Sequence, residues 1–161
     1  MRLRHIASSI LALLAIATFT QCTTQKHWVG TWGTAGQLVE PHNNPPAPGL
    51  GGNTIRQIVQ VSIGGEEVRL QLTNEFSKEP TEIIAIELAH ATTSGSSSDI
   101  DEGTTVSLTF GGQSGITMQP GEIVTSDPVK FAMGDRQNVA ITIHYGAASS
   151  TSVSGHPGSR T

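Results

Sequence analysis

The stretch RQIVQVSIGGEEVRLQLTNEF, residues 56–76, contains two runs of alternating apolar residues separated by two glycines. Alternation with a period of two is typical of a strand that buries one face. Gly64 and Gly65 can both adopt positive φ at no steric cost, as a two-residue hairpin turn requires. We therefore predict a β-hairpin with one apolar face. The cross-strand pairs expected on that face are Ile63 with Glu66, Val61 with Val68 and Val59 with Leu70.

Short runs of the same kind recur along the rest of the chain, and Gly, Pro, Ser and Asp lie between them. None of them after the N-terminal segment has a helical repeat. The sequence therefore predicts an all-β fold, an antiparallel β-sandwich of jelly-roll type. The expected inward residues are Ile84, Ile86 and Leu88; Val106, Leu108 and Phe110; Ile116 and Met118; Val124, Val129 and Phe131; and Val139, Ile141, Ile143 and Tyr145.

The first residues have the pattern of a secretory signal peptide. Arg2 and Arg4 precede an apolar run over residues 6–19 that is too short for a membrane-spanning helix. Residues 10–17 have no polar face, which disfavours an amphipathic surface helix. We therefore predict an exported protein that is periplasmic, attached to the outer membrane as a lipoprotein, or extracellular.

Composition divides the chain into four segments. The predicted signal peptide (1–21) precedes a segment (22–53) with both tryptophans and a loop rich in Pro and Gly. Residues 54–145 contain the predicted strands of the sandwich, and residues 146–161 form a tail rich in Gly and Ser. No internal repeat is visible, which argues against a propeller or a solenoid.

Cys22, the only cysteine, follows the apolar run directly. One cysteine cannot form an internal disulfide. Its position suits a bacterial lipoprotein whose first mature residue carries the lipid, and membrane attachment would follow from this. Gln21 departs from the small residue usual before such a cysteine, so cleavage near Thr20 or Gln21 without lipidation is the alternative.

The charge pattern argues against a nucleic-acid partner. The formal net charge is −4 and only 14% of the residues are charged. Lys and Arg do not cluster after the leader, whereas phosphate binding needs a positive footprint. Aromatic residues are 4% of the chain, so platforms for base stacking are scarce as well.

The residue types of catalytic and metal sites do not form a recognisable motif. Ser114 lies between glycines but misses the G-x-S-x-G spacing by one residue, so GGQSGI is interpreted as a turn. His144 has no acid nearby in the sequence, and the histidines lack metal-ligand spacing. We predict no catalytic residue, no metal and no cofactor. A Ca²⁺ site in the acidic loop is the weaker alternative, and it would use Asp99, Asp101 and Glu102.

Trp28 and Trp32 are the only large aromatic residues of the segment HWVGTWGTAGQ. Exposed tryptophans could stack on the sugar rings of a polysaccharide. The alternative is that both pack against the core, since Trp is highly buried on average.

Four segments resemble the N-terminal region of secreted bacterial SGNH hydrolases, also called GDSL-type esterases or lipases. They occur in order and cover nearly all of the chain after the leader. They are WVGTWGTAGQ (28–37), NTIRQIVQVSIGGEEVRLQLTNEF (53–76), LTFGGQSGITMQPGEIVTSDPV (108–129) and SGHPGSRT (154–161).

This resemblance implies a β-sandwich beside an α/β hydrolase domain that forms an acyl-enzyme through its serine. The family's Gly-Asp-Ser and Asp-x-x-His blocks are not found in this sequence, so no catalytic residue can be transferred to it. We expect a non-catalytic accessory portion of an extracytoplasmic esterase of acylated carbohydrates or other esters, with a sandwich that lacks its last strands. The alternatives are a free-standing carbohydrate-binding module and a surface lipoprotein. The expected partners are a polysaccharide or the hydrolase domain.

Overall fold

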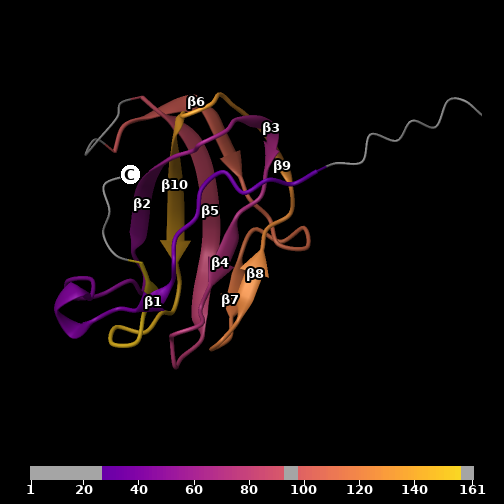
Figure 1. Cartoon of the computed structure of the whole chain (residues 1–161). Helices are drawn as coiled ribbons and strands as arrows, with labels where there is room; N and C mark the ends of the chain where they lie inside the picture. Colours follow the sequence, from indigo (N-terminus) through magenta and orange to yellow (C-terminus); the bar gives the residue numbers. More distant parts are fainter. Residues whose placement is uncertain (1–26, 93–97, 157–161) are drawn as a thin grey trace, which may run out of the picture.

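The computed structural model describes residues 27–92 and 98–156 (Figure 1). These residues form short antiparallel strands and no α-helix, which confirms the predicted all-β class. The predicted signal peptide and Cys22 lie outside the described residues. The elements are β1 (Gln37–Leu38), the 3-10 helix η1 (Pro41–Asn43), β2 (Thr54–Gln60), β3 (Gly65–Val68), β4 (Gln71–Thr73), β5 (Thr81–Ala91), β6 (Ile100–Ser107), β7 (Ile116–Met118), β8 (Ile123–Thr125), β9 (Val129–Met133), β10 (Asn138–Tyr145) and β11 (Ser154–Gly155).

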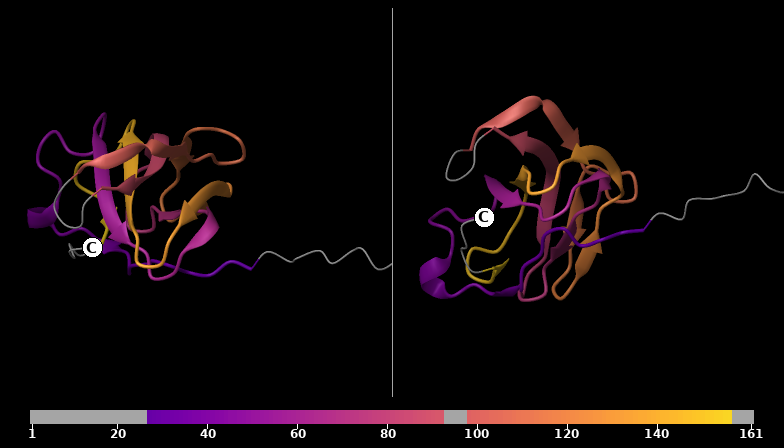
Figure 2. Two further views of the ribbon diagram at one scale, coloured as in Figure 1. Left: turned by 90° about the horizontal axis from the view of Figure 1, so that it is seen from above. Right: turned by 45° about the horizontal axis from the view of Figure 1, so that its top comes forward.

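The described strands form a sandwich-like arrangement of one larger sheet and three two-stranded ribbons (Figures 1 and 2). The larger sheet has the strand order β2-β10-β5-β6, and β7 also pairs with β5. Facing it, β3 pairs with β9 and β4 pairs with β8. The core lies between these layers. It includes Val59, Ile86, Leu88, Val139, Ile141 and Ile143 from the larger sheet and Phe131 from the facing layer.

The predicted hairpin over residues 56–76 is wrong. β2 pairs with β10, and Val59 lies opposite Val139 instead of Leu70. β3 pairs with β9, and Val68 lies opposite Val129. The chain therefore passes from one layer of the sandwich to the other between these two strands. The alternation predicted most of the apolar face, because Val59 and Val61 are buried, and Val68 and Leu70 pack against the core. Ile63, expected on the same face, is exposed.

Gly64 and Gly65 lie at the crossing, where the chain passes from β2 in one layer to β3 in the other, and they do not form the predicted hairpin turn. Neither Gly64 nor Gly65 has positive φ. A Cβ atom on Gly64 would lie 2.1 Å from the carbonyl oxygen of Met133, so only glycine fits there. The amide of Gly64 also donates a hydrogen bond to Asp135 Oδ1, at 2.7 Å. Gly64 therefore allows close contact between the crossing and the β9–β10 turn.

One predicted inward residue of β5 points outward. Ile84 is 55% exposed, whereas its neighbour Ile83 is 4% exposed and belongs to the core. The pairing of β10 with β5 shifts between Ala85 and Ile83, which marks a β-bulge. A bulge inserts one extra residue and reverses the alternation beyond it, so Ile83 takes the place expected for Ile84.

The N-terminal and C-terminal segments of the described chain meet outside the larger sheet. Gln37 and Leu38 of β1 pair with Gly155 and Ser154 of β11. Both strands come from segments that composition had separated from the sandwich, residues 22–53 and 146–161. Their pairing ties the Trp segment and the tail to one another beside the sandwich.

Candidate functional site

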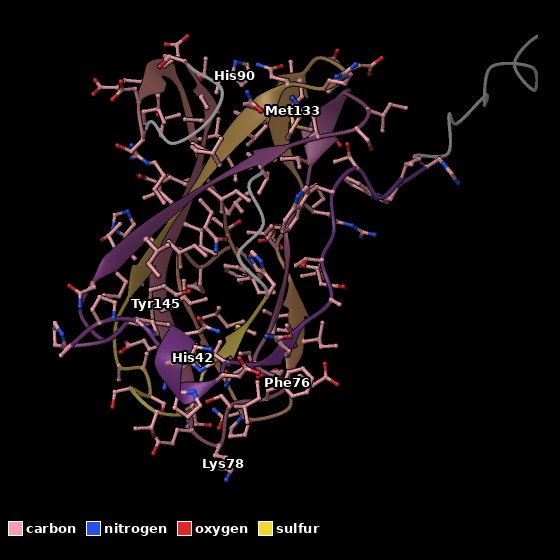
Figure 3. All side chains as sticks on the ribbon, turned by 60° about the vertical axis from the view of Figure 1, so that its left-hand side comes forward. His42, Phe76, Lys78, His90, Met133 and Tyr145 are labelled. Carbon is pink, nitrogen blue, oxygen red and sulfur yellow. The ribbon has the colours of Figure 1, made fainter. Side chains whose placement is uncertain are left out.

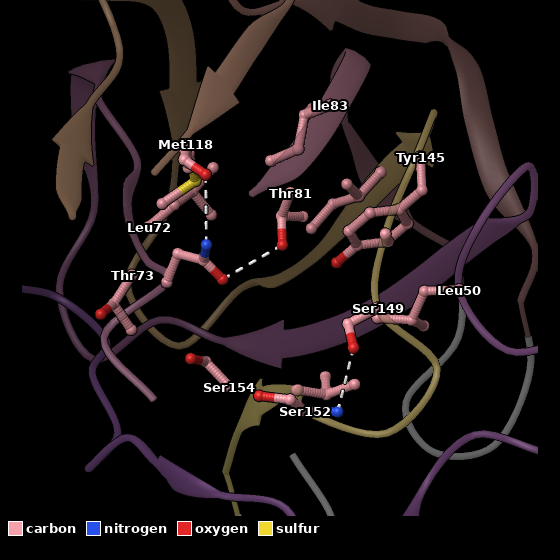
Figure 4. A pocket seen from close by; sticks show the side chains of 14 residues that line it. Leu50, Leu72, Thr73, Thr81, Ile83, Met118, Tyr145, Ser149, Ser152 and Ser154 are labelled. Atoms are coloured by element: carbon pink, nitrogen blue, oxygen red, sulfur yellow. Dashed lines mark hydrogen bonds between the residues drawn. The ribbon is translucent and has the colours of Figure 1, made fainter. Parts of the chain in front are cut away.

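A cavity of about 60 Å³ lies near one end of the sandwich (Figure 4). Its walls come from β4 and the following Asn74, from β5, β7 and β10, from the segment 148–154, and from Leu50 ahead of β2. In Figure 3 the labelled residues Phe76 and Lys78 lie at this end of the molecule, and His90 lies at the other end. The apolar part of the wall consists of Leu50, Leu72, Ile83, Met118, Ile143 and Val153.

Asn74, beside the cavity, has a complete set of hydrogen bonds. Its side-chain amide donates to the carbonyl oxygens of Glu79 and Met118, both at 3.1 Å. Its Oδ1 accepts a hydrogen bond from the Thr81 hydroxyl, also at 3.1 Å. Buried polar groups need such partners, so these hydrogen bonds use the donors of Asn74 and Thr81 to fix this wall.

Five further hydroxyl groups surround the cavity and have unused donor capacity. Within the described residues none of them donates a hydrogen bond to another protein group, whereas four accept one from a backbone amide. In Figure 4 the hydroxyl of Tyr145 points toward the open space. The five hydroxyls belong to Thr73, Tyr145, Ser149, Ser152 and Ser154.

Burial raises the pKa of Tyr145 above its ordinary value of 10.0. A phenol with a raised pKa stays protonated at neutral pH, so Tyr145 keeps a hydrogen that it can donate. It is also the only ionisable residue among those that line the cavity.

Sequence analysis did not predict this site. Ser149, Ser152 and Ser154 were placed in a tail rich in Gly and Ser, whose composition is typical of a loop. Their hydroxyls instead accept hydrogen bonds from the backbone of residues 76–78 and 151–152. The serines at 149, 152 and 154 are the sequence feature that could have indicated this site. Serines are common in loops, so without the long-range contacts this feature does not distinguish a cavity wall from an ordinary loop.

The two tryptophans are both partly buried, and each contacts another side chain. The guanidinium of Arg69 lies 4.6 Å from the ring centroid of Trp28, a cation–π contact. Trp32 packs against the core and meets His156 edge-to-face, with the ring centroids 5.9 Å apart. Trp32 therefore packs against the core, as one of the two alternatives predicted. One face of the Trp28 ring is already covered by Arg69.

The sheet brings a hydroxyl, an imidazole and a carboxylate together on its outer face. Thr54 Oγ1 lies 2.9 Å from His144 Nδ1, and Glu87 Oε2 lies 3.6 Å from His144 Nε2. His144 has no acid nearby in the sequence, as expected, but the fold places the carboxylate of Glu87 beside it from the neighbouring strand β5. Residues so far apart in sequence meet only because β2 and β5 both pair with β10.

This trio resembles a nucleophile–base–acid set only in composition. A hydrolytic triad also needs donors aimed at the developing oxyanion and a place for the substrate. Thr54 and His144 lie within the paired strands β2 and β10, where the backbone amides serve the sheet ladder. The cavity lies elsewhere and includes none of the three. We therefore assign the trio to the structure of the sheet surface.

Ser114 follows a tight turn, as the sequence predicted. Phe110 and Gln113 exchange two backbone hydrogen bonds around Gly111 and Gly112. The carboxylate of Asp127 accepts hydrogen bonds at 2.7 Å from the Thr109 hydroxyl and from the Gly112 amide. These bonds lower the pKa of Asp127 below its ordinary value of 3.8, with the Thr109 bond as the largest cause.

The acidic loop considered for Ca²⁺ is partly a strand. Asp101 and Glu102 belong to β6, and Asp101 Oδ1 accepts a hydrogen bond at 3.1 Å from the Gly103 amide. Over residues 27–92 and 98–156 no three His, Cys, Asp or Glu side chains are grouped to hold a metal ion. In the same ranges no helix is long and apolar enough to cross a membrane.

No protein-family model matches this chain, and no curated protein matches it either. The resemblance to SGNH hydrolases therefore remains a prediction from the quoted segments.

Proposed function

We propose that this chain is the accessory β-sandwich portion of an extracytoplasmic SGNH-type ester hydrolase. The observation that carries the proposal is the ordered resemblance of four segments to the N-terminal region of that family. In such a protein the serine that attacks the ester belongs to the α/β domain. The role proposed for this chain is to support that domain and to contribute to its specificity for acylated carbohydrates or related esters.

The spatial arrangement of the four segments that resemble the family supports this proposal. Thr31 of the first segment accepts a hydrogen bond at 2.9 Å from the Ser62 amide of the second. His156 of the last segment contacts Trp32 of the first, and its Nε2 lies 3.4 Å from Gln57 Nε2 of the second. The first, second and last of the four segments therefore pack against one another, which is expected if they were inherited together.

The side of the sandwich along β2 supports the idea that it packs against a further part of the same protein. Gln57 lies opposite Ile141, on the face that forms the core elsewhere, and yet it is exposed. A polar, exposed residue at an inward position marks a side that the facing layer does not cover. The proposed protein would cover this side with strands that lead into its hydrolase domain.

Reading the DNA downstream of the codon for Thr161 tests the proposal most directly. We expect it to encode, in one of the frames, further strands and a Gly-Asp-Ser block. Unrelated DNA at this place would contradict the accessory role.

An activity assay provides the second test. Purified residues 23–161 are expected to leave p-nitrophenyl acetate unhydrolysed above the buffer rate, because no residue is assigned a catalytic role. Saturable hydrolysis that follows the protein through purification, and that is lost in His144→Ala, would show instead that the Thr54 trio is catalytic.

A free-standing carbohydrate-binding module is the second candidate, and Trp28 is the observation that favours it. Its ring is partly exposed and forms a cation–π contact, so it is held in a defined orientation. Affinity electrophoresis in gels with plant and cell-wall polysaccharides should then retard the protein, and Trp28→Ala should abolish the retardation. Trp32→Phe is the matched control, since Trp32 packs against the core.

A further inference from the structure

We infer that the cavity near the end of the sandwich is a binding site for a short neutral acyl group, such as the acetyl group of an ester. The inference uses only the walls of the cavity and does not depend on the proposed hydrolase family. It rests on the volume of the cavity, its hydrogen-bond donors, its lack of charge and its opening to solvent.

The volume fits a very small group. The cavity measures about 60 Å³. An apolar cavity of roughly 150 Å³ accommodates the six carbons of benzene, so this one has room for about two to three non-hydrogen atoms. An acetyl group lies at the upper end of this range, with a methyl carbon, a carbonyl carbon and a carbonyl oxygen.

The free hydrogen-bond donors of the cavity favour a ligand that accepts hydrogen bonds. Tyr145, Ser149, Ser152 and Ser154 each retain a hydroxyl hydrogen with no acceptor in the described part of the chain (Figure 4). The oxygens of the three serines already accept hydrogen bonds from backbone amides. These groups can therefore donate to a carbonyl oxygen, which offers two lone pairs and no hydrogen of its own.

The rest of the wall suits the methyl end of the group. Ile83, Met118 and Ile143 are nearly fully buried, and they form an apolar part of the cavity wall. Neither a cationic nor an anionic side chain lines the cavity. A carboxylate would be poorly compensated here, because burying an unpaired charge is costly, whereas an ester carbonyl carries no charge.

The cavity has a rim through which the remainder of a ligand can extend. Thr73 is exposed, and Ser152 and Ser154 are only partly buried, so these lining residues mark a side that meets solvent. An acetyl group can enter from this rim while the alcohol part of the ester stays outside. The chemical class of ligand is therefore an ester or amide of a short acid, with the acyl end inserted.

The test uses the purified chain labelled with ¹³C in the methyl groups of Ile and Met, titrated with methyl acetate. We expect saturable shifts of the Ile83, Met118 and Ile143 methyl signals. Sodium acetate should bind roughly tenfold or more weakly because of its charge. Methyl butyrate should also bind more weakly, because its acyl chain exceeds the volume of the cavity.

Three variants separate binding in the cavity from binding elsewhere. Tyr145→Phe should weaken the affinity about fivefold through loss of one hydrogen bond. Ala148→Leu fills the cavity and should abolish the shifts. Thr105→Val removes an exposed hydroxyl from β6 outside the cavity and should leave the affinity unchanged. Circular dichroism checks that each variant is folded. If Ala148→Leu is unfolded, the result for Tyr145→Phe alone decides the test.

Two results would overturn the inference. One is the absence of saturable shifts at the three methyl groups, which would mean that water alone occupies the cavity. The other is binding with the same affinity in the wild type, Tyr145→Phe and a folded Ala148→Leu, which would place the ligand elsewhere on the protein.

Discussion

The pairs Gly64–Gly65 and Gly111–Gly112 lie in or beside connections between strands, and the structure uses them differently. At Gly111 and Gly112 the φ angles are +58° and +81°, and Phe110 and Gln113 exchange hydrogen bonds across the turn. These angles are close to those of a type I′ hairpin turn. At Gly64 and Gly65 neither φ is positive, and the strands on either side belong to different sheets.

The physical requirement for glycine therefore differs between the pairs. At Gly111 and Gly112 the backbone conformation requires glycine, and a Cβ atom at either position would have no atom within 4 Å. At Gly64 the lack of space requires it, because a Cβ would collide with the backbone of Met133 and Gly134. The dipeptide alone does not distinguish these cases, whereas single substitutions do.

The largest effect is expected for Gly64→Ala. The new Cβ would approach the Met133 carbonyl oxygen to 2.1 Å, and backbone atoms on both sides would have to move. Overpacking of this kind costs about 3 kcal/mol of unfolding free energy. Urea denaturation measures the loss, and a change below about 0.5 kcal/mol would contradict the close approach.

A smaller loss is expected for Gly112→Ala. Space is free there, but φ is +81°, where an L-residue with a Cβ is strained by about 1 kcal/mol. Gly112→Asn is the matched control, since Asn tolerates this region better and should lose less. Equal losses for Ala and Asn would mean that φ is not what requires glycine.

The third prediction concerns the anchor of the Gly111–Gly112 turn, Asp127. The Thr109 and Gly112 hydrogen bonds depress its pKa in the folded protein below 3.8. A carboxyl with a depressed folded pKa contributes stability at pH values above its unfolded pKa, and this contribution is lost as the pH falls through the folded pKa. Asp127→Asn should therefore lower the urea midpoint at pH 7, and the difference from the wild type should shrink below pH 4. If the difference in urea midpoint between Asp127→Asn and the wild type stays constant from pH 7 to pH 3, ionisation of the Asp127 carboxyl is not the cause of the lost stability.

The smallest effect is expected for Gly65→Ala. The nearest atom to a Cβ at this position lies 4.0 Å away, and φ is not positive. Alanine fits without strain and restricts the unfolded chain, so stability should rise by about 0.5 kcal/mol. A loss above about 1 kcal/mol, measured beside Gly64→Ala, would remove the contrast between the two neighbouring glycines.

Sequence analysis succeeded where a local pattern is sufficient. The alternation in NVAITIHY predicted that Val139, Ile141 and Ile143 point inward, and all three are in the core. It failed at Ile84, because a β-bulge depends on the pairing with β10 and leaves no mark on the alternation. It also missed the cavity, whose wall combines residues 72–74, 81–83, 118 and 143–154 from distant parts of the chain.

The sequence by itself determined the all-β class, the inward faces of most strands and the turn at Gly111 and Gly112. The physical reason is that side-chain alternation and backbone freedom are properties of a few consecutive residues. Only the tertiary structure decided that the strands flanking Gly64 separate, that Glu87 meets His144, and that the hydroxyls surround one cavity. These outcomes depend on which distant strand buries each apolar face, and no short stretch of sequence contains that information.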